Sequence, residues 1–402
     1  MTLRQIIERE ICERGPMPFS RYMELCLYHP ELGYYSRNAE QFGKAGDFYT
    51  SSDVHAVFAR LLARQFEQIW RLLESPARIE VLELGPGRGL FAQDVLDWSE
   101  KKFPEFFRAL HYSLSERSPA LRGKLKITLA RFLENGRASV LLENQRENQP
   151  VPRRLRKGTA SGASTGVLVE RALGPEVPVI IFVNEFFDAL PVEVLSAQGK
   201  LQVAIQEDRL IESWARPSSE ELEYLDRYSV HPESEERIEV PLLASHYMAE
   251  LHASMQTGLI IAIDYGYTRQ EQLAGRHRGT IMAYRQHSAS PNPYEAPGEQ
   301  DLTAHVNFTA LAAAAKSSGL QVQPLLTQSQ FLMGIGENDQ FTDAFEGCRL
   351  PQERAKVALQ LKHLVTPAGM GENFQVMVAS KGVSQAQLAE LGGLTFGKRE
   401  HA

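Results

Sequence analysis

Apolar residues recur along this chain in two alternating rhythms, which predict strands and helices in turn. A predicted helix over residues 1–14, which Gly15-Pro16 ends, places Leu3, Ile6, Ile7 and Ile11 on one face. Strands are predicted at residues 79–84, 111–115, 139–142, 178–183 and 258–264. Helical periodicity lies around them, at residues 90–102, 119–134 and 243–255. This alternation indicates βαβ units and therefore an α/β fold with a doubly wound, mainly parallel sheet.

Two pairs of segments refine the predicted sheet. Residues 178–183 and 258–264 are apolar almost throughout, as expected of central strands that are buried on both faces. Residues 321–326 and 374–379 predict a last antiparallel pair near the end of the chain.

Three segments interrupt the alternation. Residues 144–176 are polar and rich in Gly, Ser and Thr, which is typical of a solvated loop. Residues 191–257 contain a predicted β-hairpin, an acidic stretch and a helix. Residues 276–310 are rich in Gly, Pro, His and Tyr, a composition typical of functional loops.

The composition is that of an ordinary globular chain with an acidic balance. Its 402 residues include 43 Lys and Arg against 50 Asp and Glu, a net charge of −7. This balance argues against bulk binding to nucleic acid or to an anionic membrane surface. Cys12, Cys26 and Cys348 show no spacing typical of a metal site or a disulfide framework. With charges interrupting any signal-peptide core near the N-terminus, these features predict a cytoplasmic protein without a bound metal.

The strongest local signal is the run Glu83-Leu84-Gly85-Pro86-Gly87-Arg88-Gly89, which follows a predicted strand and opens a predicted helix. Glycines at such a turn let a ligand approach the backbone closely. Glu116 ends the next predicted strand, so a nucleotide-type ligand is favoured over a plain strand-to-helix turn. The dinucleotide fingerprint of NAD-dependent oxidoreductases needs a third glycine where this chain has Leu90. An oxidoreductase therefore stays only as an alternative.

The spacing acidic-x-Gly-x-Gly-x-Gly resembles the first motif of class I S-adenosylmethionine-dependent methyltransferases. S-adenosylmethionine carries a cationic sulfonium, an amino-acid end and an adenosine. Glu83 suits its amino group, directly or through water, and Glu116 is placed to accept both ribose hydroxyls. The predicted cofactor-binding residues at this turn are Glu83, Gly85, Gly87, Gly89 and Glu116.

Longer stretches resemble one family of these enzymes, the MidA-like methyltransferases. The matching stretches, in the family's order, are residues 22–30, 33–35, 46–50, 115–122, 184–192, 264–266, 279–285 and 301–306. The run Asn184-Glu185-Phe186-Phe187-Asp188-Ala189-Leu190-Pro191 is the most specific of them. The resemblance implies a Rossmann-like, class I sheet of seven strands. It also implies that Gly46 and Asp47 lie in a loop that closes over the cofactor, with a surface turn as the competing interpretation.

The family's mitochondrial members are arginine methyltransferases that assist assembly of respiratory complex I. The resemblance therefore implies a protein substrate, such as a complex I subunit. It specifies no oligomeric state. A protein that binds S-adenosylmethionine and acts mainly in assembly, with little catalysis, is a further alternative.

Arginine as the acceptor sets requirements for the site. Its guanidinium stays protonated near neutral pH, so carboxylates should bind its N–H fork and a nearby group should take a proton. Glu185 is the predicted guanidinium ligand, with Asn184 or Asp188 positioning it; a capping cluster is the competing interpretation. Asp264 is either catalytic or part of a structural turn. His305 either relays a proton or satisfies a buried hydrogen bond.

These predictions divide the chain into four parts. Residues 1–75 form a helical N-terminal extension and lid, and residues 76–190 form the S-adenosylmethionine-binding core. Residues 191–257 form an inserted α+β region for the substrate. Residues 258–402 complete the core and include the loop 276–310, where Tyr284 and Arg285 are expected to shape the acceptor channel. The Tyr34-Tyr35 pair is assigned to packing rather than to chemistry.

Overall fold

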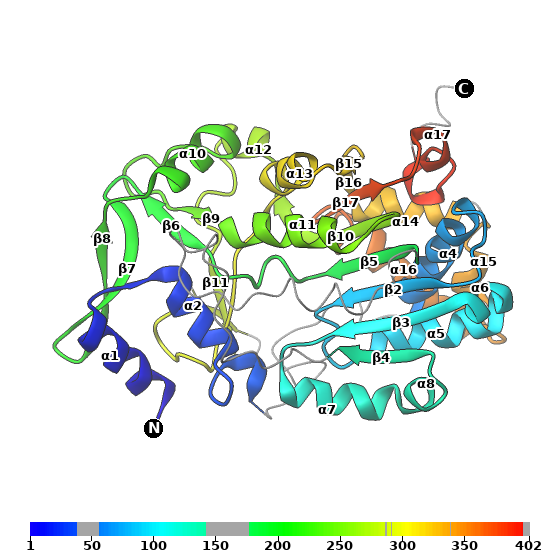
Figure 1. Cartoon of the computed structure of the whole chain (residues 1–402), viewed down its shortest axis with the longest axis horizontal. Helices are drawn as coiled ribbons and strands as arrows, with labels where there is room; N and C mark the ends of the chain where they lie inside the picture. Colours follow the sequence, from blue (N-terminus) through cyan, green and yellow to red (C-terminus); the bar gives the residue numbers. More distant parts are fainter. Residues whose placement is uncertain (38–55, 142–176, 286–287, 291, 338, 397–402) are drawn as a thin grey trace.

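The computed structural model describes residues 1–37, 56–141, 177–285, 288–290, 292–337 and 339–396. One large sheet with helices on both faces occupies one end of the molecule, and a smaller α+β part occupies the other (Figure 1). The α/β fold predicted from the sequence is confirmed.

The large sheet has the strand order β15-β17-β10-β5-β2-β3-β4, with the short strands β14 and β16 paired off this path. Its strands are β2 Ile79–Leu84, β3 Leu110–Ser115, β4 Ala138–Leu141, β5 Val179–Asn184, β10 Gly258–Tyr267, β14 Val306–Asn307, β15 Gln321–Val322, β16 Leu326–Thr327 and β17 Phe374–Lys381. Neighbours from β4 to β10 pair in parallel, whereas β17 is antiparallel to β10. The carboxyl ends of β2, β3, β5 and β10 therefore share one edge of the sheet.

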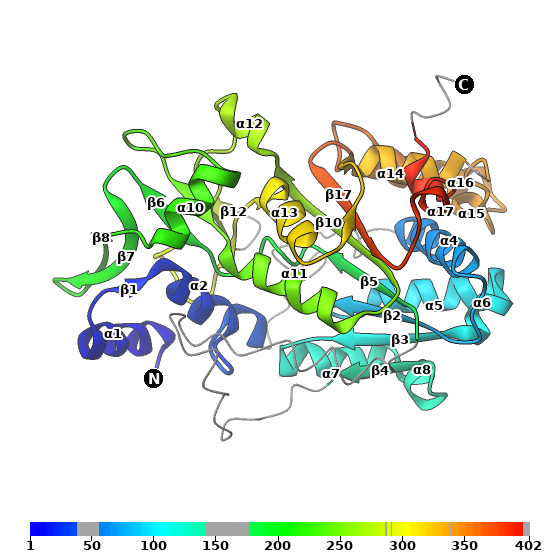
Figure 2. The ribbon, with the colours of Figure 1, turned by 45° about the horizontal axis from the view of Figure 1, so that its top comes forward.

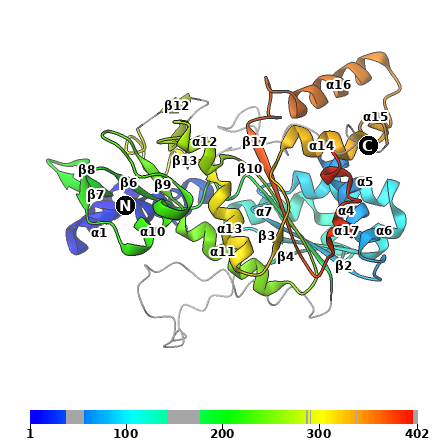
Figure 3. The same cartoon turned by 90° about the horizontal axis from the view of Figure 1, so that it is seen from above.

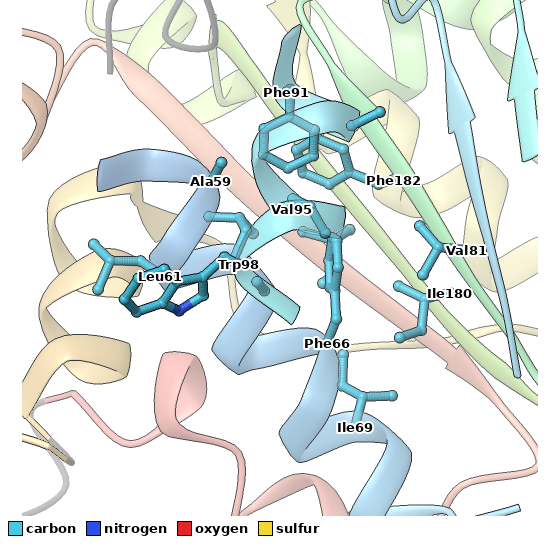
Figure 4. Close-up of a cluster of buried hydrophobic side chains, with 14 of the residues drawn as sticks. Ala59, Leu61, Phe66, Ile69, Val81, Phe91, Val95, Trp98, Ile180 and Phe182 are labelled. Atoms are coloured by element: carbon cyan, nitrogen blue, oxygen red, sulfur yellow. The ribbon is translucent and has the colours of Figure 1, made fainter. Parts of the chain in front are cut away.

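One face of the sheet carries most of the helices. They are α4 Ala56–Leu72, α5 Leu90–Lys102, α6 Pro104–Ala109, α7 Pro119–Thr128, α8 Ala130–Glu134, α14 Gln328–Glu337, α15 Thr342–Phe345, α16 Pro351–Val365, α17 Gln385–Leu388 and the 3-10 helix η3 Gly392–Leu394. Phe182 of β5 is fully buried here and stacks on Phe91 of α5, with ring centroids 4.5 Å apart. Phe66 of α4 meets the same ring edge-on at 5.7 Å (Figure 4). Every second side chain of the central strands points to this face and packs against its helices.

The opposite face is covered by α11 Leu242–Ser254 and α13 Phe308–Ser317, which lie in front of the strands in Figure 2. Met248 and Leu311 pack there with Ile181 and Ile260 of the central strands. Both faces of β5 and β10 are therefore buried, which explains why these strands are apolar at nearly every position.

The smaller part joins the start of the chain to residues that follow β5. Its elements are α1 Leu3–Arg14, β1 Met17–Pro18, α2 Phe19–Tyr28, the 3-10 helix η1 Tyr34–Ser36, β6 Glu193–Ser196, β7 Gly199–Gln206, β8 Arg209–Ala215, α10 Ser219–Tyr228, β9 Ile238–Val240, α12 Arg269–Leu273, β11 Met282–Arg285, β12 Ser288–Ser290 and β13 Asp301–Thr303. Met17 pairs with Val203, which adds β1 to the β6–β9 sheet. Strands β12, β11 and β13 form a separate small sheet. Figure 3 shows this part beside the carboxyl edge of the large sheet.

The bounds predicted for the five main parallel strands differ from the observed bounds by three residues at most, but the sequence merged or missed several other elements. The predicted helix over residues 119–134 is two helices, α7 and α8, that meet at Leu129. Strand β8 and helix α10 were not predicted as separate elements within residues 191–257. The predicted loop at residues 144–176 lies outside the described residues.

Candidate active site

The turn after β2 is built from three glycines in the left-handed region of backbone conformation. Their φ angles are 66° at Gly85, 56° at Gly87 and 78° at Gly89. A Cβ atom at Gly89 would lie 2.4 Å from Leu125 Cδ2, so α5 begins in tight contact with α7. At Gly87, no atom of the described residues lies within 4 Å of such a Cβ atom. With respect to these residues, the centre of the turn is therefore open, as a ligand cradle requires.

Two buried carboxyl groups lie beside this glycine turn. Glu116, directly after β3, accepts hydrogen bonds from the backbone N–H of Gly87 at 3.2 Å and of Ser118 at 2.8 Å. Glu83 of β2 accepts one from the Tyr112 hydroxyl at 2.9 Å. Burial raises the pKa of Glu116 to about 7 and, with a smaller contribution from the charge of Glu116, that of Glu83 to about 8. The structure thus brings five predicted cofactor residues together; the other two, Gly46 and Asp47, lie outside the described residues.

The neighbouring strand β5 ends in a second polar group. Asn184 Nδ2 donates a hydrogen bond to Glu185 Oε1 at 3.1 Å. Glu185 has a φ angle of 48°, which is costly for a residue with a side chain. Its backbone N–H donates to Ile263 O at 3.0 Å, so β10 holds this unusual backbone in place.

Asp264, on β10, organises the turn that follows Glu185. Its Oδ2 accepts the backbone N–H groups of Phe186, Phe187 and Asp188 at 3.2, 3.0 and 3.3 Å, and its Oδ1 accepts that of Tyr265 at 3.0 Å. Burial raises the pKa of Asp264 well above its ordinary value, and the charges of Asp188 and Glu185 act in the same direction. All the hydrogen bonds described here link this carboxylate to the protein backbone.

Asp188 is 4% exposed and lies at the centre of the turn. Its Oδ2 accepts a hydrogen bond from the Tyr265 hydroxyl, while its Oδ1 is buried with no hydrogen-bond partner among the described residues. Burial raises the pKa of Asp188 to about 6. A carboxyl group with that pKa can exchange a proton near neutral pH.

The predicted cofactor residues and the predicted acceptor residues lie side by side because β2 and β5 are adjacent and parallel. A Cβ atom at Gly85 would lie 3.1 Å from Phe186 Cδ2, so the two turns touch. Asn184, Glu185, Asp188 and Asp264 therefore stand next to the glycine turn.

The ring of Tyr265 lies between His305 and Asp188, since Tyr265 packs against His305 and donates a hydrogen bond to Asp188. The His305 ring packs edge-on against Tyr265 with centroids 5.4 Å apart, and its Nδ1 lies 3.3 Å from His277 Nδ1. Burial lowers the pKa of His305 to about 4, and the charge of His277 acts in the same direction. The imidazole is therefore neutral at physiological pH and is a weak base.

The sequence did not single out three polar residues around Asp188. Tyr265 holds its carboxylate, and the Tyr35 hydroxyl donates to Asp301 Oδ1 at 2.8 Å. Asp301 lay inside a stretch that resembles the family, but nothing in its spacing marked it individually. Tyr35 had been assigned to packing alone.

The described part of the chain shows no group of three or more His, Cys, Asp or Glu side chains that could hold a metal ion. Among the same residues, no helix is long and apolar enough to cross a membrane.

A parallel sheet with a glycine turn after one strand and an acidic residue after the next defines a class of nucleoside-binding α/β enzyme. The chain belongs to a family of S-adenosyl-L-methionine-dependent methyltransferases, whose model matches residues 61–326.

Several relatives carry a more specific name. A Drosophila melanogaster relative, named protein arginine methyltransferase NDUFAF7 homolog, mitochondrial, is 27% identical over 413 residues and covers 96% of this chain and 86% of its own length. The human protein arginine methyltransferase NDUFAF7, mitochondrial, is 26% identical, with 91% and 80% covered. Among solved structures, a protein from Burkholderia thailandensis described as a COG1565 superfamily member and likely methyl transferase, bound to S-adenosyl-homocysteine, is 25% identical with a TM-score of 0.76. That match covers 97% of this chain and 94% of the other.

These comparisons confirm the predicted methyltransferase activity and its cofactor, S-adenosylmethionine. They leave no support for the oxidoreductase alternative. The predicted cytoplasmic location is contradicted, because the relatives are named as mitochondrial proteins. A small number of cysteines fits more than one reducing compartment, so this feature could not decide the location.

A valine at Gly87 tests the cradle. We expect Gly87→Val to lower affinity for S-adenosylmethionine by at least about 100-fold, because the branched side chain fills the open space and the φ angle of 56° disfavours it. Gly136→Val is the matched control, since Gly136 has a φ angle of 71° and also has open space around it, away from the site. Calorimetry should show near-normal affinity for this control. Equal losses in both variants would contradict a specific role for Gly87.

The raised pKa of Glu116 predicts a pH dependence of cofactor binding. Glu116 is predicted to accept the ribose hydroxyls as an ionised carboxylate, so binding should release the proton that it holds below its pKa of about 7. Affinity for S-adenosylhomocysteine should therefore rise as the pH increases from 6 to 8, by up to about tenfold per unit below the pKa. Glu116→Gln should flatten this part of the profile. A wild-type profile identical to that of the variant would remove Glu116 from the ribose site.

Proposed function

We propose that this protein is a protein arginine N-methyltransferase and that residues 184–188 receive the acceptor. The observation that carries the proposal is the backbone of Glu185, held at a φ of 48° directly after β5 and beside the cofactor turn. Strain of this kind persists where the surroundings impose it, and it is concentrated at functional sites. The names of the relatives give independent support for arginine as the acceptor.

The side chains of this segment suit a guanidinium group. S-adenosylmethionine supplies a methyl group on a positively charged sulfur. The Glu185 carboxylate accepts two N–H groups of the arginine fork, and the Asn184 amide orients that carboxylate. A single guanidinium nitrogen then points toward the cofactor turn, so that alignment supplies much of the rate.

Asp188 is suited to take the proton. The guanidinium nitrogen forms the new bond to carbon and gives up one proton, and the electron pair of the broken bond stays on sulfur. With a pKa of about 6, Asp188 is largely ionised at neutral pH and can accept that proton. We assign Asp264 a positioning role, because it fixes the backbone on which Glu185 and Asp188 stand. His305 supports Tyr265, which in turn holds Asp188.

We further propose how the chain is divided between cofactor and acceptor. The path from β4 to β15 corresponds to the seven-stranded sheet of class I methyltransferases, with β17 as its antiparallel strand. Residues 76–190 hold the cofactor, while residues 1–75, 191–257 and the loop 276–310 form the acceptor side. A protein carries the methylated arginine, and by family resemblance a respiratory complex I subunit is the first candidate to assay.

Substitutions at Glu185 separate catalysis from folding. Glu185→Gln should lower kcat/KM for arginine peptides by about 10- to 100-fold, because a charge-assisted contact is lost. Affinity for S-adenosylmethionine should stay within about twofold of wild type, since the cofactor turn is untouched. Glu185→Gly should lose activity similarly while leaving the melting temperature unchanged or higher, because glycine adopts this φ without strain.

Glu207 offers a matched control in the exposed turn between β7 and β8. It has the same φ of 48°, so Glu207→Gln and Glu207→Gly repeat both changes away from the site. Both should keep full turnover in an assay with labelled methyl donor. Wild-type turnover in Glu185→Gln would exclude Glu185 as the acceptor ligand.

A further inference from the structure

A second buried carboxylate accompanies Asp188 on the acceptor side. Asp301, the first residue of β13, is 5% exposed and accepts the Tyr35 hydroxyl at 2.8 Å. Asp188 is held in the same way, because it accepts a hydrogen bond from the hydroxyl of Tyr265. The backbone joins their segments, because the N–H of Ala304 donates to Asp188 O at 2.9 Å.

Three tyrosines from separate elements converge on these acids. Tyr28 of α2 and Tyr35 of η1 have ring centroids 5.5 Å apart, and the Tyr28 hydroxyl donates to Ala189 O at 2.9 Å. Tyr284 of β11 pairs directly with Asp301 of β13. Burial is the largest cause of the raised pKa of all three phenols, and both Asp188 and Asp301 raise it further. Tyr28, Tyr35, Asp188, Tyr284 and Asp301 are hereafter the tyrosine–aspartate cluster.

One atom of this cluster lacks the partner that its burial requires. Asp188 Oδ1 is buried and accepts no hydrogen bond from the described residues, although Oδ2 is bonded to Tyr265. An unsatisfied buried acceptor is costly, so this oxygen is suited to accept a hydrogen bond from a donor outside the described residues. The carboxylate charge favours a cationic donor.

We propose that the tyrosine–aspartate cluster receives the cationic side chain of the acceptor and that Asp301 determines its specificity for a guanidinium group. This inference rests on the arginine methyltransferase function proposed above. Together with Glu185, the carboxylates of Asp188 and Asp301 match the several N–H donors of a guanidinium, and tyrosine rings interact favourably with its flat, weakly hydrated face. A neutral side chain of the same shape lacks the charge that offsets the burial of two acids.

Two small ligands of similar shape separate the effect of side-chain charge on binding from the effect of side-chain shape. N-acetylarginine amide and N-acetylcitrulline amide differ chiefly in that the citrulline side chain is neutral. Each is titrated by calorimetry into the full-length protein saturated with S-adenosylhomocysteine. Wild type should bind the arginine ligand at least about tenfold more tightly than the citrulline ligand, because only the guanidinium forms charge-assisted hydrogen bonds.

Asp301→Asn should reduce this arginine-to-citrulline preference by about tenfold, with unchanged affinity for S-adenosylhomocysteine. Tyr35→Phe keeps the Asp301 charge and should change the preference by less than about threefold. Asp343→Asn is the matched control for losing a buried carboxylate, since Asp343 is fully buried against Arg64, remote from the cluster. It should lower the melting temperature but leave the preference unchanged. A purely structural role for Asp301 would weaken both ligands equally and would contradict the proposal.

The outcomes distinguish this inference from the proposed function. A wild-type protein that methylates arginine peptides, with an unchanged preference in Asp301→Asn, overturns only the role of the cluster. A protein that binds the arginine ligand through Asp301 but transfers no labelled methyl to arginine overturns only the proposed function. Equal wild-type affinity for the two ligands would overturn the inference directly.

Discussion

The geometry of the site depends on one carboxylate, that of Asp264. It stands on β10 and accepts three successive backbone N–H groups from the turn that follows β5. This contact joins the carboxyl ends of β5 and β10, two adjacent central strands of the sheet. It also explains how Glu185 keeps a left-handed backbone, because the turn cannot relax without losing these hydrogen bonds. The residues that we propose receive the acceptor are therefore held in place by the sheet itself.

Acidic groups are concentrated along this edge at a cost in stability. Burial raises the pKa of Glu83, Glu116 and Asp188 to about 8, 7 and 6. Each shift means that the folded protein disfavours the ionised form of the group. A cationic cofactor beside the first two and a cationic acceptor beside the third would offset this penalty when they bind. The same acids that weaken the free protein thus provide the complementarity that a positively charged reaction requires.

The sequence predicted the parts of the molecule that follow local rules. The glycine turn could be predicted because the φ angles at Gly85, Gly87 and Gly89 favour residues without a side chain, and these leave a recognisable pattern in the sequence. Strands β5 and β10 could be predicted because burial on both faces makes them apolar at nearly every position. Asn184, Glu185 and Asp188 could be predicted as site residues because they are polar side chains at the end of a strand. The hydrogen bonds that hold these residues, chiefly those made by Asp264 and Tyr265, were not predicted.

Long-range contacts account for what could not be predicted. Tyr35 and Asp301 are 266 positions apart, and no local pattern reveals that their side chains meet. The pairing of β1 with β7 is equally remote, because two residues, Met17 and Pro18, carry too little periodicity to mark a strand. The role of Asp264 depended on the distance between two strands rather than on its neighbours in the chain. Sequence reasoning left it open between catalysis and a structural turn for that reason.

The most direct measurement is a crystal structure of this protein with S-adenosylhomocysteine bound. The ribose hydroxyls should lie within hydrogen-bond distance of the Glu116 carboxylate, with the backbone of Gly87 against the nucleoside. The sulfur should face Glu185, so that a methyl group on it would point toward residues 184–188. A nucleoside bound away from Glu116, or a sulfur turned away from Glu185, would contradict the proposed arrangement of cofactor and acceptor.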